Sequence, residues 1–136
     1  MAANSLLAGA VQMLCVIAWR GDEGANAEVL AKSLNTNPVV VRRILKALES
    51  HGLVALRPGR HGGVELLRSA ADITLEDIYK AIEPEGTLFA LRERGNTRCP
   101  VNRTMQRTLP ALFGAADTAV HDALRRTRLS TLVEQI

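Results

Sequence analysis

Basic side chains concentrate in one stretch of this 136-residue sequence. Residues 36–63 carry five cations against one acid, whereas residues 69–91 carry one lysine against five acids. The five cations are Arg42, Arg43, Lys46, Arg57 and Arg60. A guanidinium group can hydrogen-bond to the edge of guanine, and guanidinium and ammonium groups can both contact phosphates. The formal net charge of +3 is mild, so it is this local positive field that indicates a nucleic-acid partner.

A helix that starts at Pro38 must position the first three of these cations. Asn37 offers a side-chain cap, and the fixed φ of Pro38 suits the first helical position. One face of this helix is apolar, at Val41, Ile44, Leu45 and Leu48. The opposite face carries Val39, Arg43, Lys46 and Ser50, with Arg42 at its flank. The spacing predicts a helix that packs through one face, presents a basic face on the other and ends near His51.

The other two cations fall in a turn between two short segments of strand character. Gly52 stands where the end of a helix favours a left-handed residue, and residues 53–56 are apolar. Residues 57–63 are too rich in glycine and proline to be regular, and residues 64–67 can return as the partner strand. This predicts a two-stranded wing with a cationic tip.

A second predicted helix precedes the basic one. Asn26 can cap residues 27–34, and only residues 35–37 separate that segment from Pro38. Two helices joined by three residues have the spacing of a helix-turn-helix. Together with the wing, they predict a winged helix-turn-helix whose partner is a double-stranded DNA operator.

The predicted DNA contacts divide by chemistry. Arg43 and Asn37 are expected at base edges, because guanidinium suits guanine and an amide suits adenine. Arg42 and Lys46 are expected at phosphates, which position the protein without reading sequence. The other predicted contacts are Pro38 and Val39 at the start of the helix and Arg57, Arg60 and His61 on the wing. Wing arginines are expected at the backbone or in a narrow minor groove. The alternative is a solvated face that meets an acidic protein partner instead of DNA.

The whole sequence predicts a mainly α fold with a small β-wing. Its composition, 47% hydrophobic and 23% charged, is that of a folded globular protein. The predicted division is a winged helix-turn-helix DNA-binding domain at 1–83, a connecting loop at 84–98, a dimerisation helix at 99–128 and a short C-terminal helix at 129–136. Within the first of these, Leu6–Trp19 keeps helical spacing and is too short to span a bilayer. Thr74 is expected to cap a helix over residues 75–82, with Asp77 at its third position.

A second apolar periodicity begins after Cys99. Its members are Val101, Met105, Leu109, Leu112, Phe113, Ala116, Val120 and Leu124. This stripe exposes more apolar surface than a small winged domain can cover, which predicts a twofold homodimer through the same helix of a second chain. Pro110 removes a backbone donor inside the stripe, so the helix is expected to kink or break there. Ser130 can cap a last short helix, which either packs back on the core or swaps across the dimer.

Three segments resemble the Rrf2 (Rrf-two) family of bacterial regulators. They are Gly52-Leu53-Val54, the wing return at residues 62–66, and the capped helix at residues 73–83. The similarity extends over nearly the whole chain and implies a homodimeric transcription factor, usually a repressor. Two departures, Val64 in place of an aromatic residue and Pro58 inside the usual Arg-Gly pair, leave the fold intact and concern the target sequence.

The resemblance also bears on cofactors. Cluster-binding members of the family place three cysteines, and in some members a histidine, in the loop before the dimerisation helix. Cys99 matches the last of these cysteines, Asn102 stands at the histidine position, and residues 86–98 contain no cysteine. An iron–sulfur cluster needs about four ligands, mostly thiolates, so neither a cluster nor another cofactor is expected. The three histidines have no local metal-ligand spacing, so no metal site is expected.

The two cysteines have different predicted roles. Cys99 is a candidate redox-sensing thiol, because Arg98, Arg103 and a following helix start would stabilise the thiolate. The alternative is that Cys99 only caps a helix. Cys15 is expected in the core. Two cysteines are too few for a secreted disulfide framework, which predicts a reducing cytoplasm.

Other function classes find less support in the sequence. It contains no phosphate-cradling glycine loop and no nucleophile elbow, so no catalytic activity is expected. Within the DNA-binding interpretation, a small-molecule effector between the long helix and the winged domain competes with thiol sensing, because apolar junctions often hold ligands.

Overall fold

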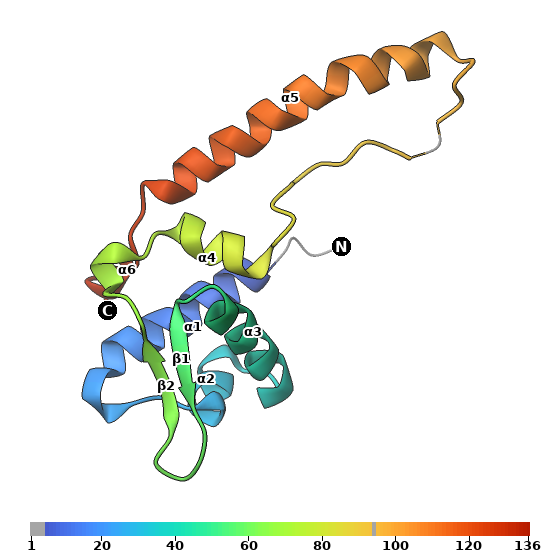
Figure 1. Ribbon diagram of the computed structural model, residues 1–136. Coiled ribbons are helices and arrows are strands. Elements are labelled where there is room, and N and C mark those ends of the chain that lie inside the picture. The colour runs from blue at the N-terminus through green and yellow to red at the C-terminus, as the bar shows by residue number, and fades with distance from the viewer. Residues whose placement is uncertain (1–4, 94) are drawn as a thin grey trace.

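The computed structural model of the chain describes residues 5–93 and 95–136, which form helices and one small sheet (Figure 1). The predicted class, mainly α with a small β-wing, is confirmed. In chain order the elements are α1 (Leu6–Arg20), α2 (Ala27–Leu34), α3 (Pro38–Ser50), β1 (Val54–Arg57), β2 (Gly63–Leu66), α4 (Leu75–Ile82), α5 (Pro100–Arg125) and α6 (Leu129–Val133). Two short 3₁₀ turns, Gly21–Glu23 and Ala70–Asp72, lie outside the sequence-based prediction.

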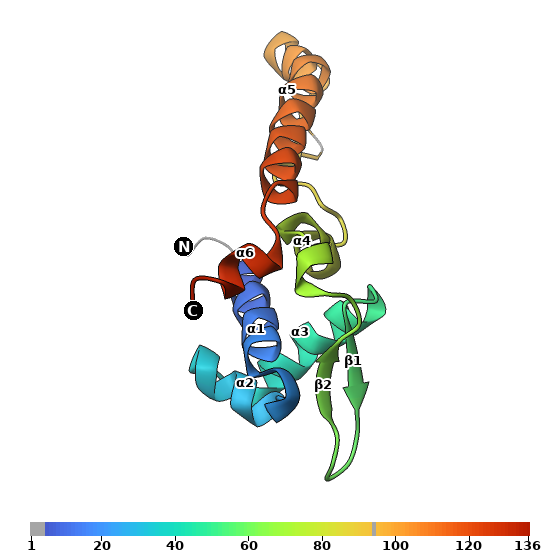
Figure 2. The ribbon, with the colours of Figure 1, turned by 90° about the vertical axis from the view of Figure 1, so that its left-hand side faces the viewer.

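One hydrophobic core holds the winged domain together. Buried side chains recur every three or four residues along α1 and α3, so each helix packs through one face. These are Ala10, Met13, Leu14 and Ile17 in α1 and Val41, Ile44, Leu45 and Leu48 in α3. Leu129, at the start of α6, is also fully buried. The C-terminal helix therefore packs on this chain's own core, beside α1 (Figure 2).

Side-chain caps fix where three helices begin. Asn26 and Asn37 each accept a backbone N–H of the first turn that follows, at 2.9 and 2.8 Å. Thr74 and Asp77 form the predicted capping box, each side chain accepting the other residue's backbone N–H. Gly52 follows α3 with a φ of 71°, which suits glycine. The predicted starts of α2, α3 and α4 are therefore confirmed.

The wing is an antiparallel hairpin whose register pairs Val54 with Leu66 and Arg57 with Gly63. Both strands lie one residue away from their predicted positions. Leu53 is not part of β1, because its N–H closes the end of α3 by bonding to the carbonyl of Leu48 at 3.0 Å. At Gly62 a Cβ atom would lie 1.8 Å from the carbonyl oxygen of Arg57, so the tip of the wing has room only for glycine there.

The long helix α5 projects away from the winged domain, and the wing lies at the other end of the molecule (Figures 1 and 2). The helix runs through Pro110 without a break, so of the two expected outcomes, a kink or a break, the break does not occur. Proline removes one backbone donor, and the carbonyl left without a partner belongs to Gln106, which is exposed to water. None of the residues of α5 is buried. Across the described residues, no helix is both long and apolar enough to cross a bilayer.

The end of the chain differs from the prediction in one detail. Arg128, not Ser130, occupies the N-cap of α6, and Ser130 lies inside the helix. The segment before α4 sets this start, because Leu129 donates its N–H to the carbonyl of Ile73 at 2.8 Å. The prediction that Ser130 caps this helix is therefore wrong.

Candidate nucleic-acid interface

The two faces of α3 differ sharply in exposure. Its apolar face is buried against the core, whereas Val39, Arg42, Arg43 and Lys46 are exposed on the other side. Val39 is 67% exposed although it is apolar. Such a side chain near the start of a helix can contact the methyl group of thymine. The helix thus offers cationic groups and one apolar group on a single open surface.

Ion pairs distinguish the cations of this surface. Arg42 bonds to Glu28 of α2 at 2.9 Å, and Arg57 bonds to Glu65 across the wing at 2.6 Å. Both pairs are solvent-exposed, so they are weak and a phosphate can displace the carboxylate. Within the described part of the chain, Arg43, Lys46 and Arg60 make no ion pair.

The two acids were missed by the sequence analysis because they flank the basic stretch. Glu28 lies on the preceding helix, and Glu65 lies two residues beyond the paired glycines. The antiparallel pairing of Ala55 with Glu65 brings the latter beside Arg57. Glu65 is a diagonal neighbour of Arg57 in the hairpin, and such a neighbour can be identified from the sequence only once the strand register is known.

A groove of about 570 Å³ separates α3 from the wing. Its basic lining residues are Arg42, Arg57 and Arg60, and the first residues of α2 also border it. The N-terminus of α2 carries partial positive charge, which adds to the arginines. His61 lies instead in a neighbouring hollow of about 430 Å³ with Arg20, Asp22 and Glu23. The structure therefore brings the predicted wing arginines to α3 and leaves His61 apart from this groove.

Asn37 has a structural role at the start of α3. Its Oδ1 accepts the N–H of Val39 at 2.8 Å, so one acceptor position is occupied by the cap. Reading adenine requires Oδ1 and Nδ2 together. Asn37 can still donate from Nδ2, whereas Arg43 has its whole guanidinium available for a base edge.

The two cysteines lie on different helices, Cys15 within α1 and Cys99 at the N-cap of α5. Cys99 is half-buried at the N-cap of α5, and its side chain makes no capping hydrogen bond. Cys15 is half-buried on α1 beside the core, and burial raises the pKa of its thiol. Both thiols are free. Cys15 is the less reactive of the two by environment.

The fold and the basic surface agree with a family comparison. A family model described as an iron-dependent transcriptional regulator, Rrf2, matches residues 3–135. The chain belongs to the Rrf2 family. This Rrf2 protein is a DNA-binding transcriptional regulator, and several of the proteins it resembles are described as HTH-type transcriptional regulators.

Individual relatives support the same assignment. The Rrf2 chain is 35% identical over 133 residues to YwnA of Bacillus subtilis, a candidate HTH-type transcriptional regulator, and the match covers 98% of each protein. A solved structure described as a candidate DNA-binding protein is 32% identical with a TM-score of 0.77, covering 94% of this chain and 98% of its own. CymR, the global cysteine regulator of B. subtilis, is 20% identical with a TM-score of 0.71, covering 100% of this chain and 98% of its own, and shares the fold.

The iron in the family's description requires ligands that this Rrf2 chain does not assemble. Cys99 is the only cysteine near the start of α5, and Asn102 follows it one turn later. Among the described residues, no three His, Cys, Asp or Glu side chains come close enough to hold a metal ion. An iron–sulfur cluster needs about four ligands, mostly thiolates, so this donor set does not fit one.

Proposed function

We propose that this Rrf2 protein is a homodimeric, sequence-specific repressor that acts in the cytoplasm and reads an operator through α3 and the wing. The observation that carries the proposal is the exposed basic face of α3 beside a groove lined by wing arginines. Arg43 takes the base edge, Arg42 and Lys46 take phosphates, and Val39 meets a thymine methyl. The wing residues Arg57, Arg60 and His61 contact the neighbouring DNA backbone or the minor groove.

The dimer part of the proposal rests on α5. Its 26 residues include no buried side chain, although Val101, Met105 and Leu112 are large, apolar and exposed. Leu88 and Phe89 of the preceding loop are exposed as well. An apolar surface of this kind on a projecting helix favours a twofold contact with the same helix of a second chain. In this division residues 1–83 bind DNA, residues 84–98 connect and residues 99–128 dimerise.

Two signals are proposed for release from DNA. One is oxidation of Cys99, which is free and half-buried at the start of α5. The other is a small-molecule effector. The sequence predicted it between the long helix and the winged domain, whereas the hollow of about 340 Å³ lined by Leu91, Thr97, Asn102 and Gln106 lies between the connecting loop and the start of α5. Both would act where the connecting loop meets the long helix.

The test is fluorescence anisotropy on DNA from upstream of the protein's own gene, with random DNA as competitor, under reducing and oxidising conditions. Specific binding is expected, because base contacts add to the phosphate contacts that any DNA provides. The opposite outcome is that the protein binds random DNA as tightly as it binds the upstream DNA and sequences selected from a random library. That result would favour a protein-interaction module.

Cys99→Ser separates the two signals. A thiol sensor loses its response to oxidant in this variant, whereas an effector sensor keeps its response to ligand. Cys15→Ser is the matched control, because Cys15 lies on α1 beside the core. A response to oxidant that survives Cys99→Ser and disappears in Cys15→Ser would contradict the assignment of Cys99.

A further inference from the structure

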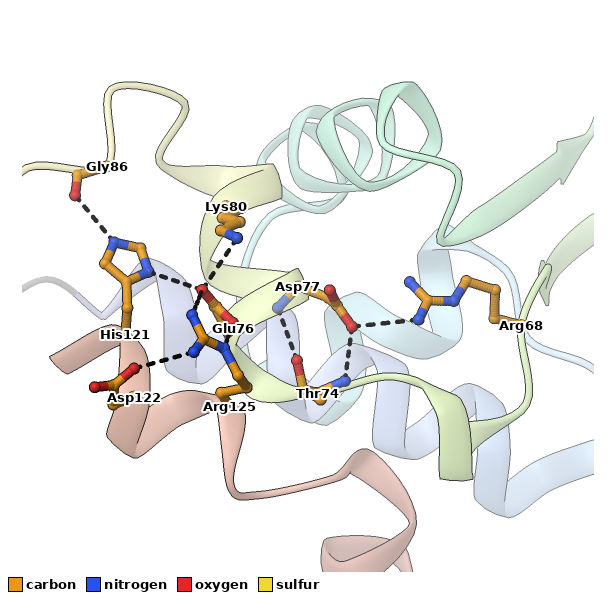
Figure 3. A network of polar contacts seen from close by, with 9 residues as sticks. All are labelled: Arg68, Thr74, Glu76, Asp77, Lys80, Gly86, His121, Asp122 and Arg125. Atoms are coloured by element: carbon orange, nitrogen blue, oxygen red, sulfur yellow. Dashed lines mark hydrogen bonds and ion pairs between the residues drawn. The ribbon is translucent and has the colours of Figure 1, made fainter. Parts of the chain in front are cut away.

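A buried carboxylate joins the winged domain to the long helix (Figure 3). Glu76 on α4 is only 5% exposed. Among the residues that the structure describes, no other charged residue is buried. Arg125, in the last turn of α5, donates from Nε to Oε2 at 2.7 Å and from its Nη2 to Oε1 at 3.0 Å. Two parallel bonds from a planar guanidinium fix direction as well as distance. This pair connects residues 49 positions apart in the sequence.

Further groups converge on the same carboxylate. Lys80, one turn along α4, lies 3.0 Å from Oε1, and the Nδ1 atom of His121 on α5 lies 3.4 Å from it. His121 Nε2 lies 3.3 Å from the carbonyl oxygen of Gly86, and its ring meets the Tyr79 ring edge-on. The Glu76 joint, defined here as Glu76, Lys80, His121 and Arg125, therefore gathers α4, α5 and the turn after α4 around one charge.

Asp122 holds the guanidinium of this joint from its other side. Its carboxylate accepts from Arg125 Nη1 at 3.0 Å, one turn earlier on α5. Arg125 is 58% exposed, so it reaches the buried carboxylate from the surface. A buried carboxylate is stable only where its partners remain in place. Rotation of α5 about its exit from the winged domain would withdraw Arg125 and His121 together and leave Glu76 with Lys80 alone.

Backbone pairing supports the joint at one side only. Leu75 donates its N–H to the carbonyl of Thr127 at 3.0 Å, and Leu129 donates to Ile73 at 2.8 Å. These bonds anchor the chain after α5 to the start of α4, but they lie beyond the helix itself. The direction in which α5 projects is therefore set by side chains, and α4 is the helix on which it packs (Figures 1 and 2).

We propose that Glu76 is a positioning residue that fixes the angle between the winged domain and α5, and through it the separation of the two α3 helices in a dimer. The inference rests on the proposed function, because separation matters only when two half-sites are read at once. Half-sites read from one face of DNA lie one helical turn or a multiple apart. A rigid joint then makes binding depend on half-site spacing, although Glu76 touches no DNA.

The first test needs no DNA. Spin labels at Ser50→Cys on α3 and Arg107→Cys on α5, in a Cys15→Ser, Cys99→Ser background, report the distance between the winged domain and the long helix. Dilution with unlabelled protein confines the signal to one chain. Both labelled positions are exposed. The distance distribution is expected to be narrow in the parent and broad in Glu76→Gln and Arg125→Gln.

The matched control is Lys80→Gln. Lys80 contacts the same carboxylate but belongs to α4 itself, so its removal takes away a cation without cutting the bridge to α5. Its distance distribution should stay narrow. Arg125→Gln keeps the test informative if Glu76→Gln folds poorly, because the Arg125 side chain is largely exposed. An unchanged distribution in both bridge variants would overturn the proposal.

The second test uses an operator selected from a random DNA library and versions of it lengthened or shortened by about two base pairs between half-sites. The bridge variants should lose on the order of tenfold of the preference for the selected spacing, the size of one strong pairwise coupling. Their affinity for a single half-site should match the parent. A preference that stays intact, or an equal loss on half-sites, would overturn the inference. Failure of the parent to select any sequence would overturn the proposed function. The distances between the spin labels would still show whether Glu76 fixes the angle between the winged domain and α5.

Discussion

At the scale of single residues, the basic surface is not uniform. Arg42 and Arg57 each face an acid, whereas Arg43 and Lys46 make no ion pair within the described residues. To contact a phosphate, a paired arginine must first release its carboxylate partner, whereas an unpaired arginine releases nothing. The sequence predicted all four as contacts from the local excess of cations and from their places on the expected helix and wing. Their ion pairs depend on tertiary neighbours that no local pattern contains.

Replacing Arg43 with Ala should separate reading from positioning. We expect discrimination between operator and random DNA to fall by about 1–3 kcal/mol, because a bidentate contact to guanine is lost. Lys46→Ala is the comparison: it should weaken both DNAs alike and lower the salt slope by about one. Competition anisotropy at several salt concentrations measures both effects. Equal loss on the two DNAs in Arg43→Ala would make it a phosphate contact instead.

Glu28→Gln tests the ion pair that faces Arg42. Removing this carboxylate frees the guanidinium and takes a negative charge from the edge of the groove. Binding to any DNA should tighten, and the salt slope should steepen by about one counterion. Titration with random DNA at several salt concentrations gives the result. Glu134→Gln, on the exposed C-terminal segment, serves as the control and should change neither quantity. Unchanged random-DNA binding in Glu28→Gln would mean that the freed Arg42 guanidinium makes no phosphate contact.

At the scale of elements, local chemistry predicted the starts of α2, α3 and α4 but not the start of α6 or the positions of the two strands. Asn26, Asn37 and Thr74 cap the helices they were expected to cap, because capping depends on residues within one turn. The strands moved by one residue because Leu53 is held by the end of α3, which is a packing effect. Pro110 was expected to kink or break α5, but the helix does not break, because one missing donor on an exposed helix is tolerated where water can satisfy the carbonyl.

The apolar stripe of α5 makes a prediction for this element alone. Leu112→Asp should convert the proposed dimer to monomer, because a carboxylate cannot be buried unpaired in an apolar contact. Leu112 is 59% exposed in the single chain, so the substitution should leave the folded winged domain intact. Light scattering measures the mass, and circular dichroism checks the helices. Thr118→Asp, on the opposite side of α5 at helical spacing, should remain dimeric. A dimeric Leu112→Asp would place the contact elsewhere.

At the scale of the whole molecule, the sequence did not predict the contacts that join the winged domain to the long helix. Glu76 looked like an ordinary acid in the first turn of a capped helix, where the helix dipole favours it. Its partner Arg125 ends another helix that follows a long connecting loop. Nothing in the spacing of either residue marks the pair. The resemblance to the Rrf2 family gave the fold and the class of function, but it did not give this joint.

The Glu76 joint predicts how the stability of the whole molecule depends on pH. The hydrogen bonds from Arg125, aided by Lys80 and opposed by burial, lower the pKa of Glu76 from 4.5 to about 2. The folded state therefore binds this proton more weakly than the unfolded state does. The stabilisation is complete above pH 4.5 and is lost as pH falls from 4.5 to about 2. Glu76→Gln has no such proton, so its deficit relative to the parent should be constant at neutral pH and shrink through that window. Urea denaturation of both proteins across this range measures the difference, in which the other carboxylates cancel. A deficit that stays the same at every pH would show that ionisation of Glu76 adds nothing to folding, because the protonated carboxyl group would then stabilise the fold as much as the carboxylate does.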